Sequence, residues 1–432
     1  MERHAEHCFW QGGNELMSEL SELYEQGIRC RKAAYALAQA ETKTKDAALM
    51  RMADILYAGR AQILQANARD IETARGSGRS ESFIDRLSLD EGRIAGICAG
   101  VREVAGLEDP CGRVLEEWQR KELHFVKKSV PIGVIGIIFE ARPNVCVDAE
   151  ALCLKSGNVC YLRGSRETIE TNRVLVELMR EALRENGLSE DCIALVQDTS
   201  HEAADDFMKM NDCLDLLIPR GSARLIEHCV RQATVPLIET GSGNCIIYVD
   251  RSVDAQEVIP VILNAKCQRV SVCNACESLL IHRERLDLVP GLLKALQEHQ
   301  VKIHGDETIC AMGEQIIPAT EADYSKEYLD YEISIRCVDS LQEAIDHINA
   351  HHTMHSDAIL SDDPKAIERF MNGVDAAVVY ANASTRFSDG HEFGFGAEIG
   401  ISTQKIHARG PMGLRELTTY RYQVYGKGTI RT

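Results

Sequence analysis

The sequence has no long apolar run and no excess of positive charge. Its longest strongly apolar run, residues 130–139, is interrupted by one proline and two glycines and has half of the ~20 residues that a membrane-spanning helix needs. Lysine and arginine number 48 against 66 aspartates and glutamates, a net charge of -18. This balance argues against a general binder of nucleic acid or of anionic membranes, so an anionic ligand would need a local cationic pocket.

Signals for export and for disulfides are also lacking. The first sixteen residues have neither the apolar core nor the small-residue cleavage site of a secretory signal. The sixteen cysteines, from Cys8 to Cys337, lie mostly inside apolar runs, which is typical of reduced core thiols. We therefore expect a cytoplasmic protein. Met17 begins a better-patterned segment, so residues 1–16 are predicted to form a disordered extension, with an upstream start as the alternative.

Sequence signals for a metal site are weak. There is one C-x-x-C pair, Cys273 and Cys276, with no second pair at the distance of a zinc site. His347, His351 and His355 recur every four residues and could present imidazoles from one helix face. A polar helix end explains the same spacing, and we expect no metal.

Apolar spacing predicts the fold class. Residues 17–107 repeat apolar side chains at i, i+3 and i+4, which predicts amphipathic helices. From residue 130 five short apolar strands alternate with helices, and the fifth of these strands is predicted at 235–239. A second series of the same kind fills residues 245–382. The alternation predicts an α/β fold with two doubly wound, Rossmann-like domains on parallel sheets.

Two segments fit neither series. Residues 118–130 and 418–430 mix aromatic, β-branched and charged side chains in the manner of solvent-facing ribbon strands. An isolated ribbon is marginally stable, so we expect these strands to pair with another chain in a homo-oligomer. Edge strands guarded by lysine and arginine are the alternative.

The loop of residues 267–276 holds three thiols, Cys267, Cys273 and Cys276. A free thiol has a pKa near ~8.5 and becomes a useful nucleophile when a cation or amide dipoles favour the thiolate. From composition alone, a cysteine in such a loop is more often unreactive than catalytic, and this holds for each of the three.

Four segments carry a resemblance to a known family. They are EARPNV (140–145), IETGSGNC (238–245), NAKCQRVSVCNA (264–275) and the long segment 384–420. Together they are similar to the glutamate-5-semialdehyde dehydrogenases, also called gamma-glutamyl phosphate reductases, of the aldehyde dehydrogenase superfamily. The similarity runs from about residue 17 to the C-terminus and implies an aldehyde dehydrogenase-like fold with a β-ribbon flap.

The resemblance implies three functional parts. They are a cofactor-binding domain at 17–117 and 131–240, a catalytic domain at 241–406, and an oligomerisation flap at 118–130 and 407–432.

The resemblance also implies a reaction. It is the NADPH-dependent reduction of L-glutamyl 5-phosphate to L-glutamate 5-semialdehyde with release of phosphate, the second step of proline biosynthesis from glutamate. Glutamate 5-kinase, which makes the acyl phosphate, is then a candidate transient partner. The alternatives are a CoA-acylating aldehyde dehydrogenase, against which segment 384–420 speaks, and a non-catalytic redox or metal-binding protein.

Three residues match the catalytic positions of the resembled family. Cys273 matches the nucleophile that would form a glutamyl thioester, with Cys267 and Cys276 as competing candidates. Asn144 matches the side-chain donor of the oxyanion hole, although it could only cap the following helix. Glu239 matches the general base of hydrolytic members, although a polar turn residue is the alternative.

The cofactor signal does not follow the usual fingerprint, because no G-x-G-x-x-G follows a strand. Gly221 and Ser222 lie between a predicted strand and a helix, where a helix N-terminus can hold pyrophosphate. Arg163 and Arg166 match positions near the adenosine ribose, where two cations would favour NADP(H) over NAD(H). Glu327 matches the glutamate that the superfamily places on the nicotinamide-side ribose.

The implied substrate carries an α-carboxylate, which needs donors. The candidates are Arg142, Ser384, Thr385 and Arg386. Arg409 could bind the same group or could only hold the C-terminal loop.

Overall fold

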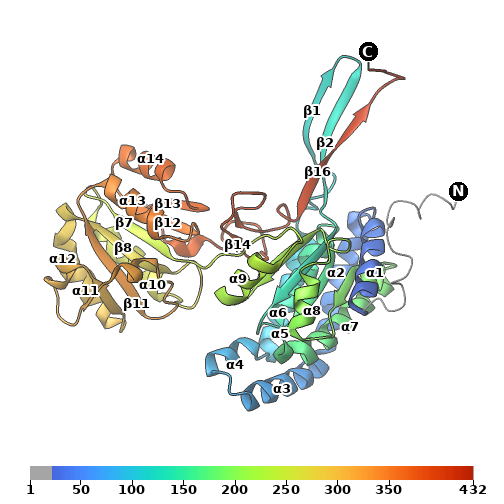
Figure 1. The fold of residues 1–432 in the computed structure, drawn as a ribbon, viewed down its shortest axis with the longest axis horizontal. Helices are drawn as coiled ribbons and strands as arrows, with labels where there is room; N and C mark the ends of the chain where they lie inside the picture. The colour runs from blue at the N-terminus through green and yellow to red at the C-terminus, as the bar shows by residue number, and fades with distance from the viewer. Residues whose placement is uncertain (1–21, 432) are drawn as a thin grey trace.

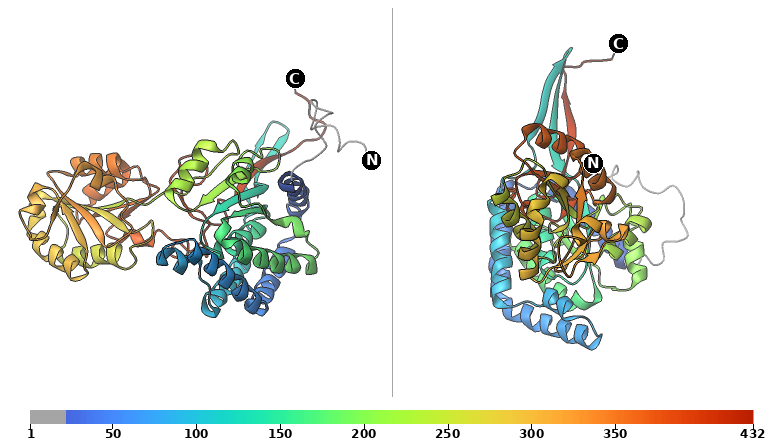
Figure 2. Two further views of the ribbon diagram at one scale, coloured as in Figure 1. Left: turned by 60° about the horizontal axis from the view of Figure 1, so that its bottom comes forward. Right: turned by 90° about the vertical axis from the view of Figure 1, so that its left-hand side faces the viewer.

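The computed structural model describes residues 22–431, so the extension predicted for residues 1–16 lies outside the described part. The chain forms two α/β lobes and a three-stranded ribbon that projects from the first lobe (Figure 1). Helices cover the sheet of each lobe (Figure 2). Among residues 22–431, no helix combines the length and the apolarity needed to cross a membrane.

Five helices open the first lobe, as the sequence predicts for this part of the chain. Their bounds are α1 Glu22–Leu37, α2 Thr42–Ala58, α3 Arg60–Gly76, α4 Glu81–Leu87 and α5 Glu91–Gly106. On α2 the apolar face of Leu49, Met52 and Leu56 is buried in the core of the lobe. Spacing of i, i+3 and i+4 places these side chains on one face, which explains the burial.

A parallel sheet in the order β5-β4-β3-β6 forms the centre of the first lobe. The strands are β3 Val134–Phe139, β4 Val159–Gly164, β5 Ile193–Leu195 and β6 Leu216–Arg220. The helices between and after them are α6 Asn144–Lys155, α7 Ile169–Glu185, α8 His201–Phe207 and α9 Ala223–Gln232. All residues of β3 and β4 are buried, as expected for strands covered on both faces.

The fifth strand predicted at 235–239 is wrong. This segment makes only an isolated bridge between Leu237 and Leu217 of β6. Pro236 has no N–H to donate to a ladder, so the segment runs beside β6 without extending the sheet.

The second lobe holds a seven-stranded sheet in the order β10-β9-β11-β8-β7-β12-β13. Its strands are β7 Cys245–Val249, β8 Cys276–His282, β9 Lys302–Gly305, β10 Ile317–Pro318, β11 Glu332–Val338, β12 Ser356–Leu360 and β13 Val378–Ala381. Its helices are α10 Ala255–Cys267, α11 Val289–Glu298, α12 Glu307–Cys310, α13 Leu341–His351 and α14 Pro364–Gly373. The sequence predicts this series except for β9, β10 and α12, which are too short to show a period.

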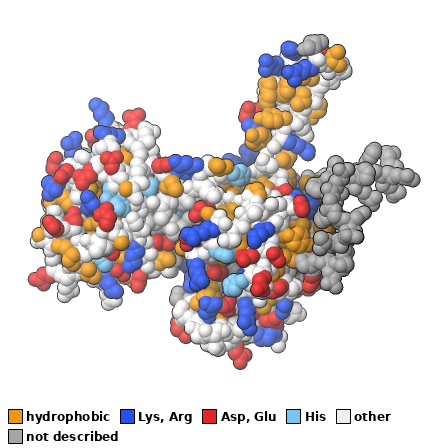
Figure 3. All heavy atoms as spheres, in the orientation of Figure 1, with side chains coloured by type: hydrophobic (Ala, Val, Ile, Leu, Met, Phe, Trp, Pro, Cys, Tyr) orange, Lys and Arg blue, Asp and Glu red, His pale blue; other side chains and the backbone are white. Residues whose placement is uncertain are grey.

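The ribbon consists of β1 Val114–Arg120, β2 Leu123–Pro131 and β16 Thr418–Tyr425, all antiparallel. The sequence expects ribbon strands at 118–130 and 418–430, and the structure resolves the first segment into a hairpin that begins at Val114. Trp118 stacks on Phe125 with ring centroids 5.2 Å apart. Hydrophobic side chains cover the visible face of the ribbon (Figure 3).

After β13 the chain returns to the first lobe. A two-stranded sheet, β14 Ile401–Ser402 and β15 Gly410–Pro411, lies in this returning segment. Thr240, which follows β6 in the chain, bridges to Ser402. The two lobes are therefore tied together near the segment that connects them.

Candidate active site

Cys273 lies in a loop that joins α10 to β8 and is held tightly against β7. The Cys245 thiol donates a hydrogen bond to the Cys273 carbonyl oxygen at 3.2 Å. A Cβ atom at Gly243 would overlap that carbonyl oxygen, so only glycine allows the two backbone segments to cross at this distance. The position of the Cys273 backbone is thus fixed by its neighbours.

Asn274 holds the other side of the same loop. Its buried side-chain amide donates to the carbonyl oxygens of Ser388, at 2.9 Å, and Arg386. In return the Thr385 hydroxyl donates to the Asn274 carbonyl oxygen at 2.7 Å, while the Ser384 hydroxyl caps a short 3-10 helix, Thr385–Phe387. Segment 384–388 is therefore brought against the cysteine, but the Ser384 and Thr385 hydroxyls already have partners.

The three thiols of the loop differ in their surroundings. Cys276 is fully buried in β8, its thiol donates to the Ser278 carbonyl oxygen, and burial raises its pKa to about 12. Cys267 ends α10 and packs against the core of the second lobe. Cys273 is partly exposed. Burial raises the pKa of Cys273 to about 11, and the Arg220 guanidinium acts in the opposite direction. Without substrate, the Cys273 side chain is therefore a thiol near neutral pH.

Arginines from five segments gather in the region of Cys273. Loss of water around its guanidinium lowers the pKa of Arg142, and the like charges of Arg220, Arg86 and Arg269 lower it further. Burial, followed by the like charge of Arg269, lowers the pKa of Arg386. Cys273 acts in the opposite direction and raises this pKa. In a chain with a net charge of -18, this cluster is a local concentration of positive charge of the kind that an anionic ligand requires.

Two carboxyl groups face the same cluster. The Asn144 amide donates to Asp148 Oδ2 at 2.9 Å, one turn along α6. Partial burial raises the pKa of Asp148 to about 6, against the effects of Asn144 and Arg220. Burial, followed by the charge of Asp389, raises the pKa of Glu398 to about 7, and its Oε2 has no hydrogen-bond partner. Both groups can exchange protons near neutral pH.

Glu239 and Glu327 occupy different surroundings. Glu239 is partly buried and its side chain makes no hydrogen bond or ion pair within the described residues. Glu327 Oε1 accepts a hydrogen bond from the Gly243 amide at 2.6 Å, which ties it to the segment that crosses behind Cys273. Burial raises the pKa of Glu327.

Four of the predicted cofactor residues lie at the carboxyl ends of strands β4 and β6 or just after them. Arg163 is buried at the end of β4, where its Nη2 donates to the carbonyl oxygens of Thr199 and Ser200 at 3.1 and 2.9 Å. Its Nε has no partner, and Arg166 is exposed three residues further on. These arginines come at the carboxyl edge of the parallel sheet, where doubly wound folds bind dinucleotides.

Gly221 and Ser222 form the turn into α9. The Ser222 hydroxyl caps the helix, and the Ser222 amide donates to Glu140 Oε2 at 2.9 Å. A Cβ at Gly221 would lie 2.6 Å from the same carboxylate oxygen. The turn therefore approaches Glu140 closely, and a pyrophosphate bound there would have to share the Ser222 amide with this carboxylate.

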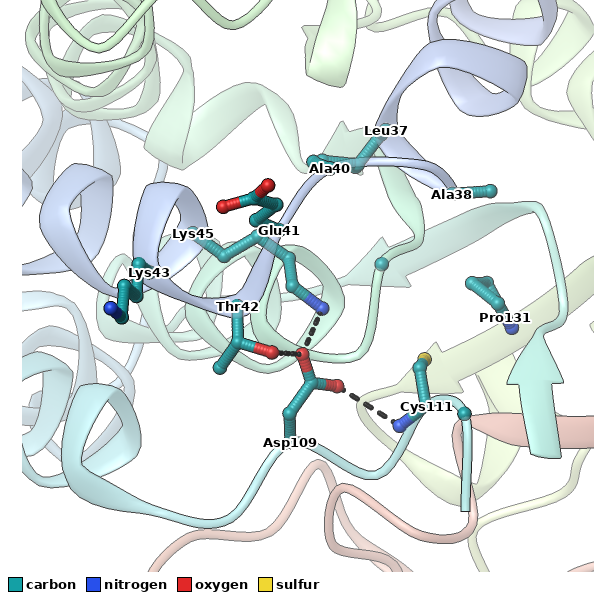
Figure 4. A pocket seen from close by; sticks show the side chains of 12 residues that line it. Leu37, Ala38, Ala40, Glu41, Thr42, Lys43, Lys45, Asp109, Cys111 and Pro131 are labelled. Carbon is teal, nitrogen blue, oxygen red and sulfur yellow. Dashed lines mark hydrogen bonds and ion pairs between the residues drawn. The ribbon is translucent and has the colours of Figure 1, made fainter. Parts of the chain in front are cut away.

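A hollow of about 480 Å³ lies elsewhere in the first lobe, at the start of α2 (Figure 4). Asp109 in its wall pairs with Lys45 at 2.6 Å and accepts hydrogen bonds from the Thr42 hydroxyl and the Cys111 amide. These polar groups satisfy one another, so they hold the start of α2 to the segment before β1.

The histidine series does not form one helical face. His351 ends α13, and His355 lies beyond it, where its Nδ1 contacts the Ser356 hydroxyl at 2.9 Å. Among residues 22–431, no group of three or more His, Cys, Asp or Glu side chains is arranged to hold a metal ion.

Sequence reasoning did not select four residues of this site. They are Asp148, Arg220, Arg269 and Glu398. A signal existed for Arg220, because it lies directly before Gly221 and Ser222 in the turn that follows a predicted parallel strand, and carboxyl ends of parallel strands carry ligand-binding groups. The other three become neighbours only through the packing of distant segments.

Comparison with known proteins identifies the family. A sequence model described as the aldehyde dehydrogenase family matches residues 28–329. A gamma-glutamyl phosphate reductase of Enterococcus faecalis is 50% identical over 416 residues, which cover 96% of this chain and all of that protein. The crystal structure of gamma-glutamyl phosphate reductase from Thermotoga maritima is 43% identical, covers 95% of this chain and all of that one, and has a TM-score of 0.94. An engineered glycolyl-CoA reductase with bound NADP+, 14% identical with a TM-score of 0.66, shares the fold. The chain therefore belongs to the aldehyde dehydrogenase family, in its gamma-glutamyl phosphate reductase branch.

Proposed function

We propose that this enzyme reduces L-glutamyl 5-phosphate to L-glutamate 5-semialdehyde with NADPH, through a thioester on Cys273. The relatives' name supplies the substrate class. The observation that carries the proposal is the partly exposed residue Cys273, whose backbone is fixed in place near Arg142, Arg220 and Arg386, three arginines that form no ion pair within residues 22–431. A dianionic acyl phosphate with an α-carboxylate has the charge that such a cluster attracts.

The first half of the reaction is acyl transfer. Cys273 Sγ attacks the acyl carbonyl carbon, the carbon–oxygen bond to phosphate breaks with its electron pair, and phosphate leaves. Asn144 has two amide hydrogens and gives one to Asp148, so the second can donate to the oxyanion beside the Cys273 backbone amide. Because the Cys273 pKa is about 11, its proton needs an acceptor during attack, and Glu239 is the candidate from sequence.

The second half is reduction of the thioester. A bound nicotinamide cofactor supplies the hydride to the thioester carbonyl carbon. The carbon–sulfur bond then breaks, the aldehyde leaves, and Cys273 takes up a proton. We propose that Glu327, Gly221, Ser222, Arg163 and Arg166 hold the cofactor. The partnerless Arg163 Nε and the exposed Arg166 favour a 2′-phosphate, hence NADP(H).

For the α-carboxylate, Arg142 and Arg386 are the stronger candidates among the four that the sequence suggests. The Thr385 hydroxyl donates its proton to Asn274, and the Ser384 hydroxyl, which accepts from the Arg386 amide, is a neutral donor. Arg142 makes no side-chain hydrogen bond among the described residues, and Arg386 donates only its Nε, to Gln268, so both retain charged donors for a carboxylate. The cysteines described are free thiols, consistent with the cytoplasm as the expected compartment. Transient delivery of the labile acyl phosphate by a glutamate 5-kinase remains a prediction.

We propose a second copy of this chain as the partner of the ribbon. Tyr420, Tyr422 and Tyr425 of β16 are each more than half exposed. Tyr420 and Tyr422 share one face of the ribbon with Val424 and Trp118, and this face exposes more apolar surface than monomeric proteins usually do.

The reverse reaction tests the function. Glutamate 5-semialdehyde and NADP+ should yield NADPH only when phosphate is present, and Cys273→Ala should lower the rate by ~10⁴-fold or more. Cys267→Ala, in the same loop, serves as the matched control and should keep the wild-type rate within about twofold. Turnover that requires CoA instead of phosphate, or an active Cys273→Ala variant, would contradict the proposal.

A further inference from the structure

The backbone of Arg220 occupies a fixed position, and its charge acts on Cys273. It ends β6, where its backbone pairs with Phe139 of β3, and its carbonyl oxygen accepts from the Glu140 amide at 3.1 Å. This contact holds Arg220 next to the turn that carries Arg142 and Asn144. The side chain therefore starts from the carboxyl edge of the sheet.

The returning C-terminal segment makes room for the Arg220 guanidinium. A Cβ atom at Gly400 would overlap Arg220 Nη1 and would lie 2.8 Å from the Thr240 methyl carbon. Gly400 also has a φ of +148°, in a region that favours glycine. The space that the guanidinium occupies therefore exists only because residue 400 is a glycine and has no Cβ atom.

The Arg220 side chain has no partner within residues 22–431, where it makes neither a hydrogen bond nor an ion pair. Arginine offers five N–H donors in a planar fork that suits two phosphate oxygens at once. Arg31, by contrast, is paired with Asp215. The free donors of Arg220 are therefore available to a ligand.

Arg220 acts on the reacting groups themselves. It is the principal cation that opposes the effect of burial on Cys273, and it also acts on Asp148 and Glu398. The oxygen that leaves the acyl carbon is one bond away from the atom that Cys273 attacks. A cation close to the sulfur is therefore close to the leaving group.

We propose that Arg220 binds the phosphoryl group of the acyl phosphate, and inorganic phosphate in the reverse direction. The inference rests on the proposed function and assigns one role within it. As the carbon–oxygen bond breaks, its electron pair goes to the phosphate oxygen, and Arg220 stabilises that charge without transferring a proton. The turn of Gly221 and Ser222 remains for the cofactor pyrophosphate.

The test varies phosphate, NADP+ and glutamate 5-semialdehyde separately in the reverse assay. Arg220→Gln should raise the KM for phosphate ~10- to 100-fold, the loss expected for a charged hydrogen-bond donor, with the KM for NADP+ within about twofold. Arg220→Lys should recover part of the phosphate affinity. Arg231→Gln, an exposed position on α9 paired with Glu227, is the control and should leave all three KM values unchanged.

A phosphate-free measurement separates this inference from the proposed function. With semialdehyde and NADP+ alone, wild type and Arg220→Gln should each release about one NADPH per active site, because thioester formation needs no phosphate. If both show this amplitude but the phosphate KM is unchanged in Arg220→Gln, the Arg220 inference is wrong and the function stands. A rise confined to the KM for NADP+ would also overturn it. An absent burst in wild type would instead contradict the thioester function.

Discussion

Buried lysines and the arginines near Cys273 differ in whether a carboxylate of the protein pairs with them. Three lysines with at most 3% of the side chain exposed each pair with a carboxylate, namely Lys45 with Asp109, Lys155 with Asp46 and Lys266 with Glu277. Around Cys273, the side chains of Arg142, Arg220 and Arg269 pair with no carboxylate in residues 22–431. The buried lysines are each neutralised by a carboxylate of the protein. Those three arginines near Cys273 have no such carboxylate in the described part of the chain, and we propose that an anionic substrate neutralises them.

The difference has an energetic consequence. Removing one member of a buried ion pair leaves an uncompensated charge, which costs ~3–5 kcal/mol. Removing one arginine from a like-charged cluster relieves repulsion: the pKa of Arg142 is lowered first by loss of water around its guanidinium and then by the charges of Arg220, Arg86 and Arg269. Stability and activity should therefore respond to different cations.

The largest stability effect is expected at Lys266. Its Nζ lies 2.5 Å from Glu277 Oε2, and Glu277 Oε1 accepts from the Leu329 amide. Lys266→Met should lower the free energy of unfolding in urea by ~3–5 kcal/mol, because it strands a buried carboxylate. Arg142→Met should change it by less than ~1 kcal/mol. Equal losses of unfolding free energy in Lys266→Met and Arg142→Met would contradict the distinction between paired lysines and unpaired arginines.

A smaller effect concerns Glu398, whose Oε2 has no partner. Its pKa of about 7 in the folded protein lies above the ordinary 4.5, so the folded state binds the proton more tightly than the unfolded state. The unfolding free energy should therefore fall by ~2 kcal/mol between pH 4.5 and pH 7, and Glu398→Gln should remove that part of the pH dependence. Urea titrations at both pH values measure it.

Asp109 provides the opposite case for the same titrations. Burial acts to raise its pKa, but hydrogen bonds from Lys45 and Thr42 outweigh burial and lower it. Its contribution to stability is present above its ordinary pKa and is lost as the pH falls through the folded-state value. Asp109→Asn should lower the free energy of unfolding mainly at neutral pH and much less at low pH. If Glu398→Gln leaves the pH dependence of the unfolding free energy unchanged, the explanation given for Glu398 is wrong.

The smallest effect is expected at the ribbon, where apolar side chains lie exposed rather than in a core. Tyr422 is 54% exposed and contacts Trp118 edge to face. Tyr422→Asp should weaken self-association by ~10-fold or more, since it buries a charge in the interface. Tyr35→Asp, at a 66% exposed position on α1, is the control and should leave the association constant unchanged. A monomeric wild type in light scattering would end the proposal of a second copy.

Sequence patterns predicted the fold well where elements are long. One of the helices expected between the apolar strands after residue 130 is α6, Asn144–Lys155, and the apolar runs of β3 and β8 are buried parallel strands. The failure at 235–239 has a cause in Pro236, and β9 is too short for a period of two to be visible. The spacing of apolar residues predicts which face of a helix or strand is buried. It does not predict strand pairing where a single residue, such as Pro236, prevents a backbone hydrogen bond.

Less of the site could be predicted from the sequence. The resemblance selected Cys273, Arg142 and Arg386, which do gather at one place. It did not select Arg220 or Arg269, because whether an arginine keeps an anion nearby depends on segments that are distant in sequence. That property exists only in the folded chain.

A phosphate-free stopped-flow experiment tests the central claim most directly. Wild-type enzyme mixed with glutamate 5-semialdehyde and NADP+ should produce a single burst of about one NADPH per active site, with one glutamyl group on Cys273 by mass spectrometry of peptides, and should turn over only after phosphate is added. Steady NADPH production without phosphate and without a modified Cys273 would contradict the account.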